Sequence, residues 1–314
     1  MEPAYSVILF TTASGAGYGL LIWLSLARLS GAWAIAPLAG AAGSLAALAL
    51  VTTGLLASLF HLGHPERAWR ALSQWRSSWL SREGVAALLT YPPALLFATG
   101  WVWGVIPPAW MSGAAVATLL LSILTVYCTG MIYASLKTIP RWCNGWVLPL
   151  YLALALTSGG LLLLLLLSLS GGADRSLVLL VLAVLVLTWL MKWSYWRDID
   201  RRKPGSNPGT ATGLGHLGEI RQLEAPHTSD NYLLKEMGFQ VARKHAAQLR
   251  RYALLLGLLL PALLLAIAAT RSGQMTVIIA LAALLSGLTG VLLERWLFFA
   301  EARHMVILYY GRSL

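Results

Sequence analysis

Charged residues are scarce in this sequence of 314 residues, and cysteine is nearly absent. Asp, Glu, Lys and Arg together make up 11% of the chain, whereas soluble globular domains contain about 25%. An iron–sulfur cluster usually takes four thiolates, and Cys128 and Cys143 are also too far apart for a C-x-x-C redox pair. The sequence therefore predicts that this protein holds no such cluster and that both cysteines serve packing.

Long hydrophobic runs dominate the sequence, which has 58% hydrophobic residues and a mean hydropathy of +0.71. A hydrocarbon core about 30 Å thick needs roughly 20 apolar residues per helical span. Eight stretches meet this length, at 7–29, 38–60, 84–106, 113–136, 146–170, 176–196, 251–271 and 275–299. The sequence therefore predicts an all-α, polytopic membrane protein, with eight transmembrane helices in a single domain over residues 1–314.

Histidine occurs six times, always at the end of a predicted span or in a connection. The six are His61, His64, His216, His227, His245 and His304. A haem held between two helices would need histidines that face each other inside the spans. We therefore expect no haem in this protein.

The charge that is present is mostly positive, with 23 Lys and Arg against 12 Asp and Glu. With eight spans, both termini lie on the same side of the membrane as the connections after spans two, four and six. Every basic residue except Arg28, Arg175 and Arg271 falls on that side. Cytoplasmic loops are enriched in Lys and Arg, so we expect both termini inside, although Glu2 and Arg28 alone would favour the reverse. The net charge of +11 is interpreted as an orientation signal, and no nucleic-acid partner is expected.

The connection between spans two and three, HLGHPERAWRALSQWRSSWLSREG, gathers unusual chemistry at residues 61–84. Pro65 suits the first position of a short helix, and Trp69, Leu72 and Trp75 then follow at spacings of three as an apolar stripe. The sequence predicts an amphipathic interfacial connection over 61–83 that lies at the level of the lipid headgroups. The simplest interpretation is an interfacial helix with no chemical role.

Two ionisable residues at the ends of this connection favour a chemical role. His61 and Glu83 are predicted at the cytoplasmic ends of spans two and three, where side chains are partly desolvated and can exchange protons with a ligand in the bilayer. A quinone headgroup needs hydrogen-bond donors for its carbonyls and takes up protons on reduction, which an imidazole and a carboxyl can provide. Arg67 or Arg82 would hold Glu83 ionised or stabilise negative charge on the headgroup.

Five motifs occur in the order found in a known family. They are HLGHPERAW and SWLSREG in the 61–84 connection, YASLKTIPRW after span four, KEMGFQVARKHA before span seven and ERWLFFA at the end of span eight. Over nearly its whole length the sequence resembles the membrane-anchor subunits of dimethyl sulfoxide reductase. The resemblance implies eight spans, binding of menaquinone or another quinone such as ubiquinone, no haem, and docking of an iron–sulfur subunit that joins the anchor to a molybdopterin catalytic subunit.

The resemblance also implies which residues serve the quinone. His61 and Glu83 match the family positions implicated in quinol binding, and Arg67 matches a weaker candidate. His64 departs from the common HLGRP form, so it either joins the site or replaces an arginine contact. Arg82, Trp79 and Tyr133 complete the candidate set, whereas Tyr127 is more typical of an interface anchor.

The predicted orientation indicates which kind of complex within this resemblance fits the sequence. In exported dimethyl sulfoxide reductases the corresponding face is periplasmic, whereas the charge of this protein places it inside. The membrane subunit of a cytoplasmic sulfite dehydrogenase, which passes electrons from sulfite to quinone, fits this placement. We therefore expect a protein of the bacterial inner membrane whose soluble partners bind on the cytoplasmic side, with a quinol-oxidising reductase anchor as the alternative.

Several further features allow two interpretations each. GLGHLG at 213–218 matches a dinucleotide-binding pattern, but it lies in a polar connection rather than between a strand and a helix. Residues 197–250 are expected to form a cytoplasmic loop and a basic docking helix that starts near Asn231 and is capped by Ser229 or Asp230. Glu294 and Arg295 need not pair with each other, and they are expected either to form structural ion pairs with neighbouring helices or to line a proton route to the quinone.

Two other functions compete with quinone chemistry. A secondary transporter would show repeated halves and charged residues near the bilayer midplane, and neither is evident in the sequence. The scarcity of ionisable residues at the span centres also argues against a proton pump. A purely structural anchor without a quinone site is the third interpretation, and substitution of His61 or Glu83 would distinguish it.

Overall fold

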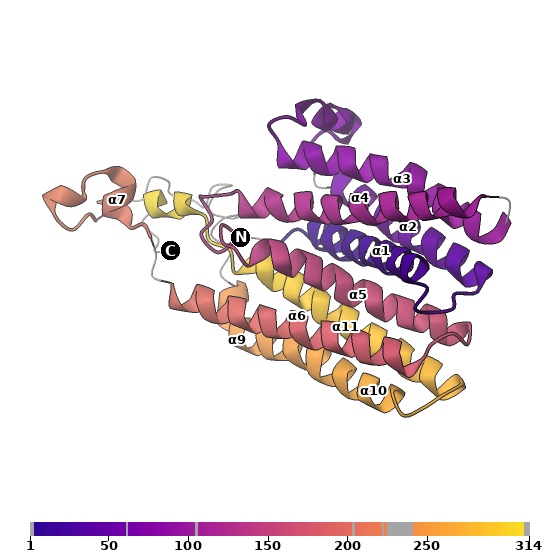
Figure 1. Cartoon of the computed structure of the whole chain (residues 1–314). Coiled ribbons are helices and arrows are strands. Elements are labelled where there is room, and N and C mark those ends of the chain that lie inside the picture. Colours follow the sequence, from indigo (N-terminus) through magenta and orange to yellow (C-terminus); the bar gives the residue numbers. More distant parts are fainter. Residues whose placement is uncertain are drawn as a thin grey trace.

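A computed structural model of the protein describes residues 3–60, 62–103, 106–202, 205–221, 223–224 and 241–310. These residues are predominantly helical and contain no strand. Eight helices are long and apolar enough to cross a membrane, and they lie side by side along one direction (Figure 1). Seven are α1 (Tyr5–Ser30), α2 (Pro37–Leu59), α3 (Trp79–Trp103), α4 (Pro108–Ala134), α5 (Val147–Leu169), α6 (Arg175–Arg201) and α11 (Gln274–Ala300). The eighth span, His245–Ala268, combines α9 (Val241–Leu254), η3 (Leu255–Leu259) and α10 (Leu260–Ala268).

The helix ends follow from local sequence signals. Pro37 and Pro108 open α2 and α4 at the first helical position, where the missing N–H leaves no intrahelical bond unmade. Asp174 caps α6 by accepting a hydrogen bond of 2.9 Å from the backbone N–H of Leu177. Burial disfavours the ionised form of Asp174, but hydrogen bonds from Leu177 and Ser176 outweigh it and hold the pKa of this carboxyl below its ordinary value.

The prediction of an all-α bundle with eight spans is confirmed, although four boundaries differ by five or six residues. The fourth span begins at Pro108 rather than at residue 113, and the seventh begins at His245 rather than at residue 251. The third span begins at Trp79 rather than at residue 84, and the sixth continues to Arg201 rather than ending at residue 196.

Hydropathy detects only the apolar part of a helix, whereas the helix continues as long as its backbone hydrogen bonds are made. At the start of α3, for example, the Arg82 N–H donates a hydrogen bond of 3.1 Å to the Ser78 carbonyl. Glu83 therefore lies inside the helix and not before it.

Helices α1 and α5 cross in close contact at two glycines. A Cβ atom added at Gly19 would lie 1.8 Å from the Ala155 carbonyl oxygen, and one added at Gly159 would lie 2.1 Å from the Gly19 carbonyl carbon. Small residues let membrane helices approach closely, which replaces the hydrophobic driving force that lipid does not supply. This contact places α1 at the centre of the bundle, between α2, α4 and α5.

The seventh span contains one π-helical turn, η3, directly before Pro261. Proline has no N–H to bond the carbonyl four residues earlier, so the regular ladder cannot continue through this position. The Ser286 hydroxyl of α11 donates a hydrogen bond of 2.7 Å to the Leu256 carbonyl in the turn. Gly257 and Gly290 let the two helices approach there.

The short elements gather at the end of the bundle where α1 begins (Figure 1). They are η1 (Pro65–Gln74), α7 (Pro208–Thr212), η2 (Gly215–Leu217) and η4 (Met305–Tyr310). Tyr309 of η4 donates a hydrogen bond of 2.7 Å to the Ala211 carbonyl of α7. At the opposite end, Arg175 and Arg271 line one cavity of about 190 Å³.

Two features of the predicted 197–250 loop have different outcomes. The pattern GLGHLG follows α7 and encloses η2, with no strand among the described residues beside it, so it lacks the setting of a dinucleotide-binding turn. The predicted helix start near Asn231 and its caps Ser229 and Asp230 lie outside the described residues. The part of that helix that is described, from Val241, runs directly into the seventh span.

Candidate functional site

A groove of about 500 Å³ opens between α1, α2, η1, α3 and α4. Its walls are largely apolar, and they include Val7, Phe10, Leu55, Leu59, Leu62, Trp69, Leu72, Leu88 and Ile132. Glu83 and Tyr133 also line it, and Glu83 is the one acidic residue among the described lining residues. With Ser58, the groove is therefore an apolar site with three polar side chains among its described lining residues.

The element η1 forms one wall of the groove, and its sequence explains how. It is a 3₁₀ helix with His64 at its N-cap and Pro65 at its first position. Residues three apart lie on the same face of a 3₁₀ helix, so Trp69 and Leu72 both face the groove. Leu72 also lies over Gly84 of α3, where an added Cβ would come within 2.9 Å of its Cδ2 atom.

Glu83 is buried at the base of this wall, with 4% of its surface exposed. Its carboxyl oxygen makes a short hydrogen bond with the hydroxyl of Thr129, which also lies 3.0 Å from the Thr125 carbonyl. No Lys or Arg in the described part of the protein lies within ion-pair distance of this carboxyl. A buried carboxyl without a cation must obtain its stability from such hydrogen bonds.

Neither Arg82 nor Arg67 pairs with Glu83, so the first of their two predicted roles, holding Glu83 ionised, has no support in these contacts. The second role, stabilising negative charge on a headgroup, stays a prediction. Arg82 donates to the Trp75 and Arg76 carbonyls at 2.9 and 2.7 Å, and its guanidinium lies 4.2 Å from the centre of the Trp79 ring. These contacts fasten the end of the η1 connection to the first turn of α3. Glu83 lies deeper in the bundle, beyond reach of these surface cations.

The other candidates in the connection are exposed. His64 and Arg67 both approach Glu66, with nitrogen–oxygen distances of 3.0 and 3.7 Å, and their side chains are 68% and 57% exposed. His61 itself lies outside the described residues. Leu62, which follows it, and Leu59, two residues before it, both line the groove.

Tyr133 connects the groove to an aromatic cluster in the bundle. Its ring stacks on Tyr151 with centroids 5.8 Å apart, and it meets Trp142 edge-on at 5.1 Å. Phe298 and Phe299 of α11 complete the cluster. Tyr127, by contrast, packs its ring against Trp79 and does not line the groove.

A buried ion cluster next to these aromatic rings agrees with the expectation that Glu294 and Arg295 form ion pairs with a neighbouring helix. Glu294 and Arg295 do pair with each other, through bonds of 2.5 and 2.8 Å, although they are adjacent in α11. Lys192 of α6 also reaches Glu294 at 2.5 Å, and all three side chains are at most 3% exposed. In an apolar interior the cost of an unpaired charge exceeds the cost of bending two long side chains together. Lys192 was not among the predicted site residues, and its place in an apolar span was the available signal.

A second ion cluster joins three helices at the end where α1 begins. The Arg250 guanidinium bonds both carboxylate oxygens of Glu301, at 2.8 and 2.9 Å, and also pairs with Asp200. Arg141 approaches the same Glu301 at 3.5 Å. These contacts hold α6, α9 and the end of α11 together.

Comparisons with known proteins agree with this architecture. Residues 1–302 match the family model described as DMSO reductase anchor subunit (DmsC). The protein is 35% identical to the C subunit of the sulfite dehydrogenase of Allochromatium vinosum, over 99% of both sequences. It is also 29% identical to the C component of the anaerobic dimethyl sulfoxide reductase of Escherichia coli, over 44% of this sequence and 48% of that one.

The match to the family model covers almost the whole sequence, and one relative matches it from end to end. Eight apolar helices make it a multi-pass membrane protein. The chain therefore belongs to the DMSO reductase anchor subunit family, and it is a membrane-anchor subunit of a DMSO reductase-type or sulfite dehydrogenase complex.

Proposed function

We propose that the groove binds a quinone headgroup and that this protein exchanges electrons between an iron–sulfur partner and the membrane quinone pool. One observation carries the proposal: a buried carboxyl, Glu83, lies at the base of an apolar groove that is walled by the 3₁₀ helix η1. A volume of about 500 Å³ lies within the range of about 300–1,000 Å³ that is typical of small-molecule sites. Apolar walls suit the quinone ring and its isoprenoid tail, and the polar side chains of Glu83 and Tyr133 suit the carbonyls of the ring.

The quinone, when bound, supplies two-electron, two-proton redox chemistry. Glu83 acts as the proton donor and acceptor at one carbonyl, because it is the acidic residue that lines the groove. The neutral acid satisfies the geometry around Thr129, since the carboxyl then donates to the hydroxyl while the hydroxyl donates to the Thr125 carbonyl. Tyr133 orients the ring from the inner wall, and His61 is proposed as the donor to the second carbonyl.

Sulfite oxidation coupled to quinone reduction is the reaction that we propose for the whole complex. The full-length similarity to a sulfite dehydrogenase subunit supports it. The concentration of Lys and Arg on the side of both termini supports a cytoplasmic position for an iron–sulfur and a molybdopterin subunit. Quinol oxidation in a dimethyl sulfoxide reductase complex is the second candidate, supported by the partial similarity to those anchors.

The first experiment measures quinone reduction by the purified complex with sulfite as the electron donor, alongside quinol oxidation with dimethyl sulfoxide as the acceptor. Glu83→Gln removes the acid but keeps the size of the side chain, so we expect quinone-linked turnover to fall by about 100-fold or more. Electron transfer from sulfite to an artificial acceptor at the catalytic subunit is expected to continue. A purely structural anchor would keep both activities, and turnover with dimethyl sulfoxide alone would select the second candidate.

A pair of matched substitutions on α3 tests the groove itself. Leu88 lines the groove and Leu89 does not, yet both are about equally exposed, at 55% and 54%. Leu88→Trp fills the groove, so we expect a raised KM for quinone, whereas Leu89→Trp faces lipid and is expected to leave KM unchanged. Equal effects of the two substitutions would mean that the quinone binds elsewhere.

A further inference from the structure

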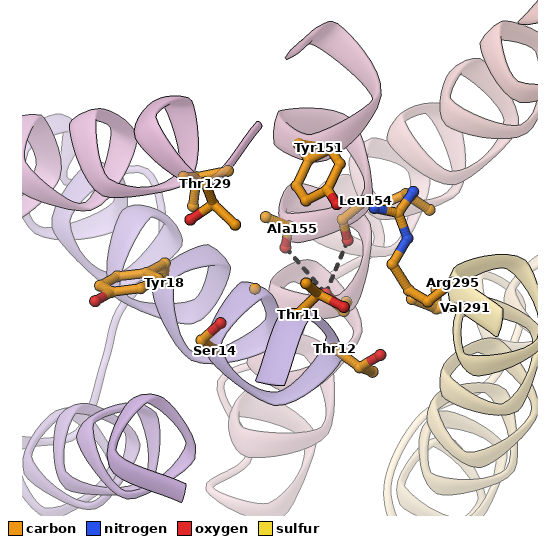
Figure 2. A pocket seen from close by; sticks show the side chains of 13 residues that line it. Thr11, Thr12, Ser14, Tyr18, Thr129, Tyr151, Leu154, Ala155, Val291 and Arg295 are labelled. Atoms are coloured by element: carbon orange, nitrogen blue, oxygen red, sulfur yellow. Dashed lines mark hydrogen bonds between the residues drawn. The ribbon is translucent and has the colours of Figure 1, made fainter. Parts of the chain in front are cut away.

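A small cavity lies inside the bundle beside Glu83, and polar side chains line it (Figure 2). Its volume of about 20 Å³ exceeds the roughly 10–15 Å³ that one water molecule needs. The lining includes Thr11, Thr12 and Tyr18 of α1, Thr129 of α4, Tyr151 of α5 and Arg295 of α11. The cavity therefore has both the room and the polar groups for a water site.

The hydroxyl groups around the cavity point to the same conclusion. Those of Thr12, Tyr18 and Tyr151 form no hydrogen bond of normal geometry with any described residue, although each residue is less than a tenth exposed. Buried hydroxyls nearly always have a partner, which is either a protein group or an ordered water molecule. A water molecule in this cavity supplies a partner to the hydroxyls that reach it.

The cavity lies between Glu83 and the buried cluster of Lys192, Glu294 and Arg295. Thr129 lines the cavity and also bonds the Glu83 carboxyl at the groove. Arg295 lines the other side, where its guanidinium lies 4.4 Å from the centre of the Tyr151 ring (Figure 2). Arg295 belongs to the buried cluster of two cations and one carboxylate, so this wall of the cavity carries a net positive charge.

We propose that the cavity holds a water molecule that returns a proton to Glu83 through Thr129 after Glu83 has protonated the quinone. The proposal rests on the proposed function. The Thr129 hydroxyl gives its proton to the Glu83 carboxylate and takes one from the water, and the water regains its proton from solvent on the side of the α1 N-terminus. The two electrons come from the iron–sulfur partner. Arg295 is a positioning residue, since its charge stabilises the negative charge that appears on Glu83 and on the water.

The test compares three substitutions in α4 within the assembled complex. Thr129→Val keeps the shape of the side chain but removes the relay hydroxyl, so kcat for quinone reduction is expected to fall by at least about tenfold with KM unchanged. Thr129→Ser retains a hydroxyl and is expected to restore kcat. Thr118→Val is the matched control, because Thr118 is buried in α4 like Thr129 but does not line the cavity, and its hydroxyl has no hydrogen-bond partner among the described residues.

A second readout does not depend on turnover. In a cryo-EM map of the complex at a resolution that shows ordered water, we expect density within hydrogen-bond distance of Thr129 and Tyr151, and we expect it to be lost in Thr129→Val. Absence of this density from the unsubstituted complex, or equal kcat for Thr129→Val and Thr118→Val, would overturn the relay. If Glu83→Gln abolished turnover in the same experiments, the quinone site would stand without the relay. If Glu83→Gln and Leu88→Trp kept full turnover, the proposed function itself would fail.

Discussion

At the scale of single residues, the buried cluster of Lys192, Glu294 and Arg295 shows how charge is stabilised within an apolar bundle. Glu294 accepts two hydrogen bonds from Arg295 and forms an ion pair with Lys192. The ammonium group of Lys192 also lies 4.1 Å from the centre of the Tyr195 ring and 5.0 Å from that of Trp196. Such cation–π contacts contribute more when the cation is desolvated. The single carboxylate is therefore the group on which both cations depend.

This dependence predicts unequal effects of two substitutions. Glu294→Gln leaves two buried cations without their carboxylate and is expected to lower the free energy of unfolding by about 3–5 kcal/mol. The cluster has two cations and one carboxylate, and Lys192→Met removes one of the cations. The remaining ion pair of Glu294 and Arg295 has no net charge, so we expect a clearly smaller loss of unfolding free energy. Thermal unfolding in detergent compares the two, and equal losses would show that the cluster is not organised around Glu294.

At the scale of the elements, glycine positions decide which helices touch. The contact of α1 with α5 depends on Gly19 and Gly159, whose backbones approach too closely for a Cβ atom. This approach also brings Tyr151 and Ser158 of α5 to the cavity lined by α1. The geometry of the cavity is therefore a consequence of helix packing.

Gly159→Ala is expected to destabilise the protein by about 1–3 kcal/mol, because overpacking at a close crossing forces the backbones apart. Alanine has the higher helix propensity by about 1 kcal/mol, so a local effect alone would have the opposite sign. Gly113→Ala in α4 is the control, since an added Cβ meets no atom within 4 Å there. Unfolding temperatures in detergent would contradict the packing argument if both variants were stabilised.

At the scale of the whole molecule, the protein has two unlike ends. The end with η1, α7 and η4 holds most of the Lys and Arg, and the other end holds Arg28, Arg175 and Arg271. The groove and both ion clusters lie towards the basic end. If that end faces the cytoplasm, as the distribution of charge predicts, and if the groove binds a quinone as we propose, the protons for the quinone come from the same compartment as the soluble partners. Turnover then moves no net charge across the membrane by this route.

The orientation is testable with single cysteines at exposed positions of the two ends. Glu219 lies after η2, and Ser272 lies between α10 and α11. In intact cells whose protein lacks Cys128 and Cys143, we expect Ser272→Cys to react with a membrane-impermeant maleimide and Glu219→Cys to react only after the cells are opened. The reverse pattern would place the soluble partners in the periplasm and remove the argument for a cytoplasmic complex.

Much of the fold could be predicted from the sequence, because hydropathy is a local property and each span is long. The 61–84 connection was also identified, since Trp69 and Leu72 at a spacing of three indicate one apolar face whether the helix is α or 3₁₀. The partners of individual side chains were not predictable in the same way. Arg82 bonds carbonyl groups of the preceding connection rather than Glu83, whereas Arg295 bonds the adjacent Glu294. Adjacency in the sequence therefore does not decide whether an arginine pairs with its neighbour.

The sequence by itself determined the class of this protein, its eight spans, its family and the segment that walls the groove. Each of these depends on the composition or the order of residues, and lipid enforces the helical state of every long apolar run. Only the tertiary structure decided that Glu83 bonds Thr129 of another helix, that Lys192 reaches Glu294, and that a cavity separates these sites. Such contacts join residues far apart in the sequence, and they are fixed by how closely the helices pack rather than by any local pattern.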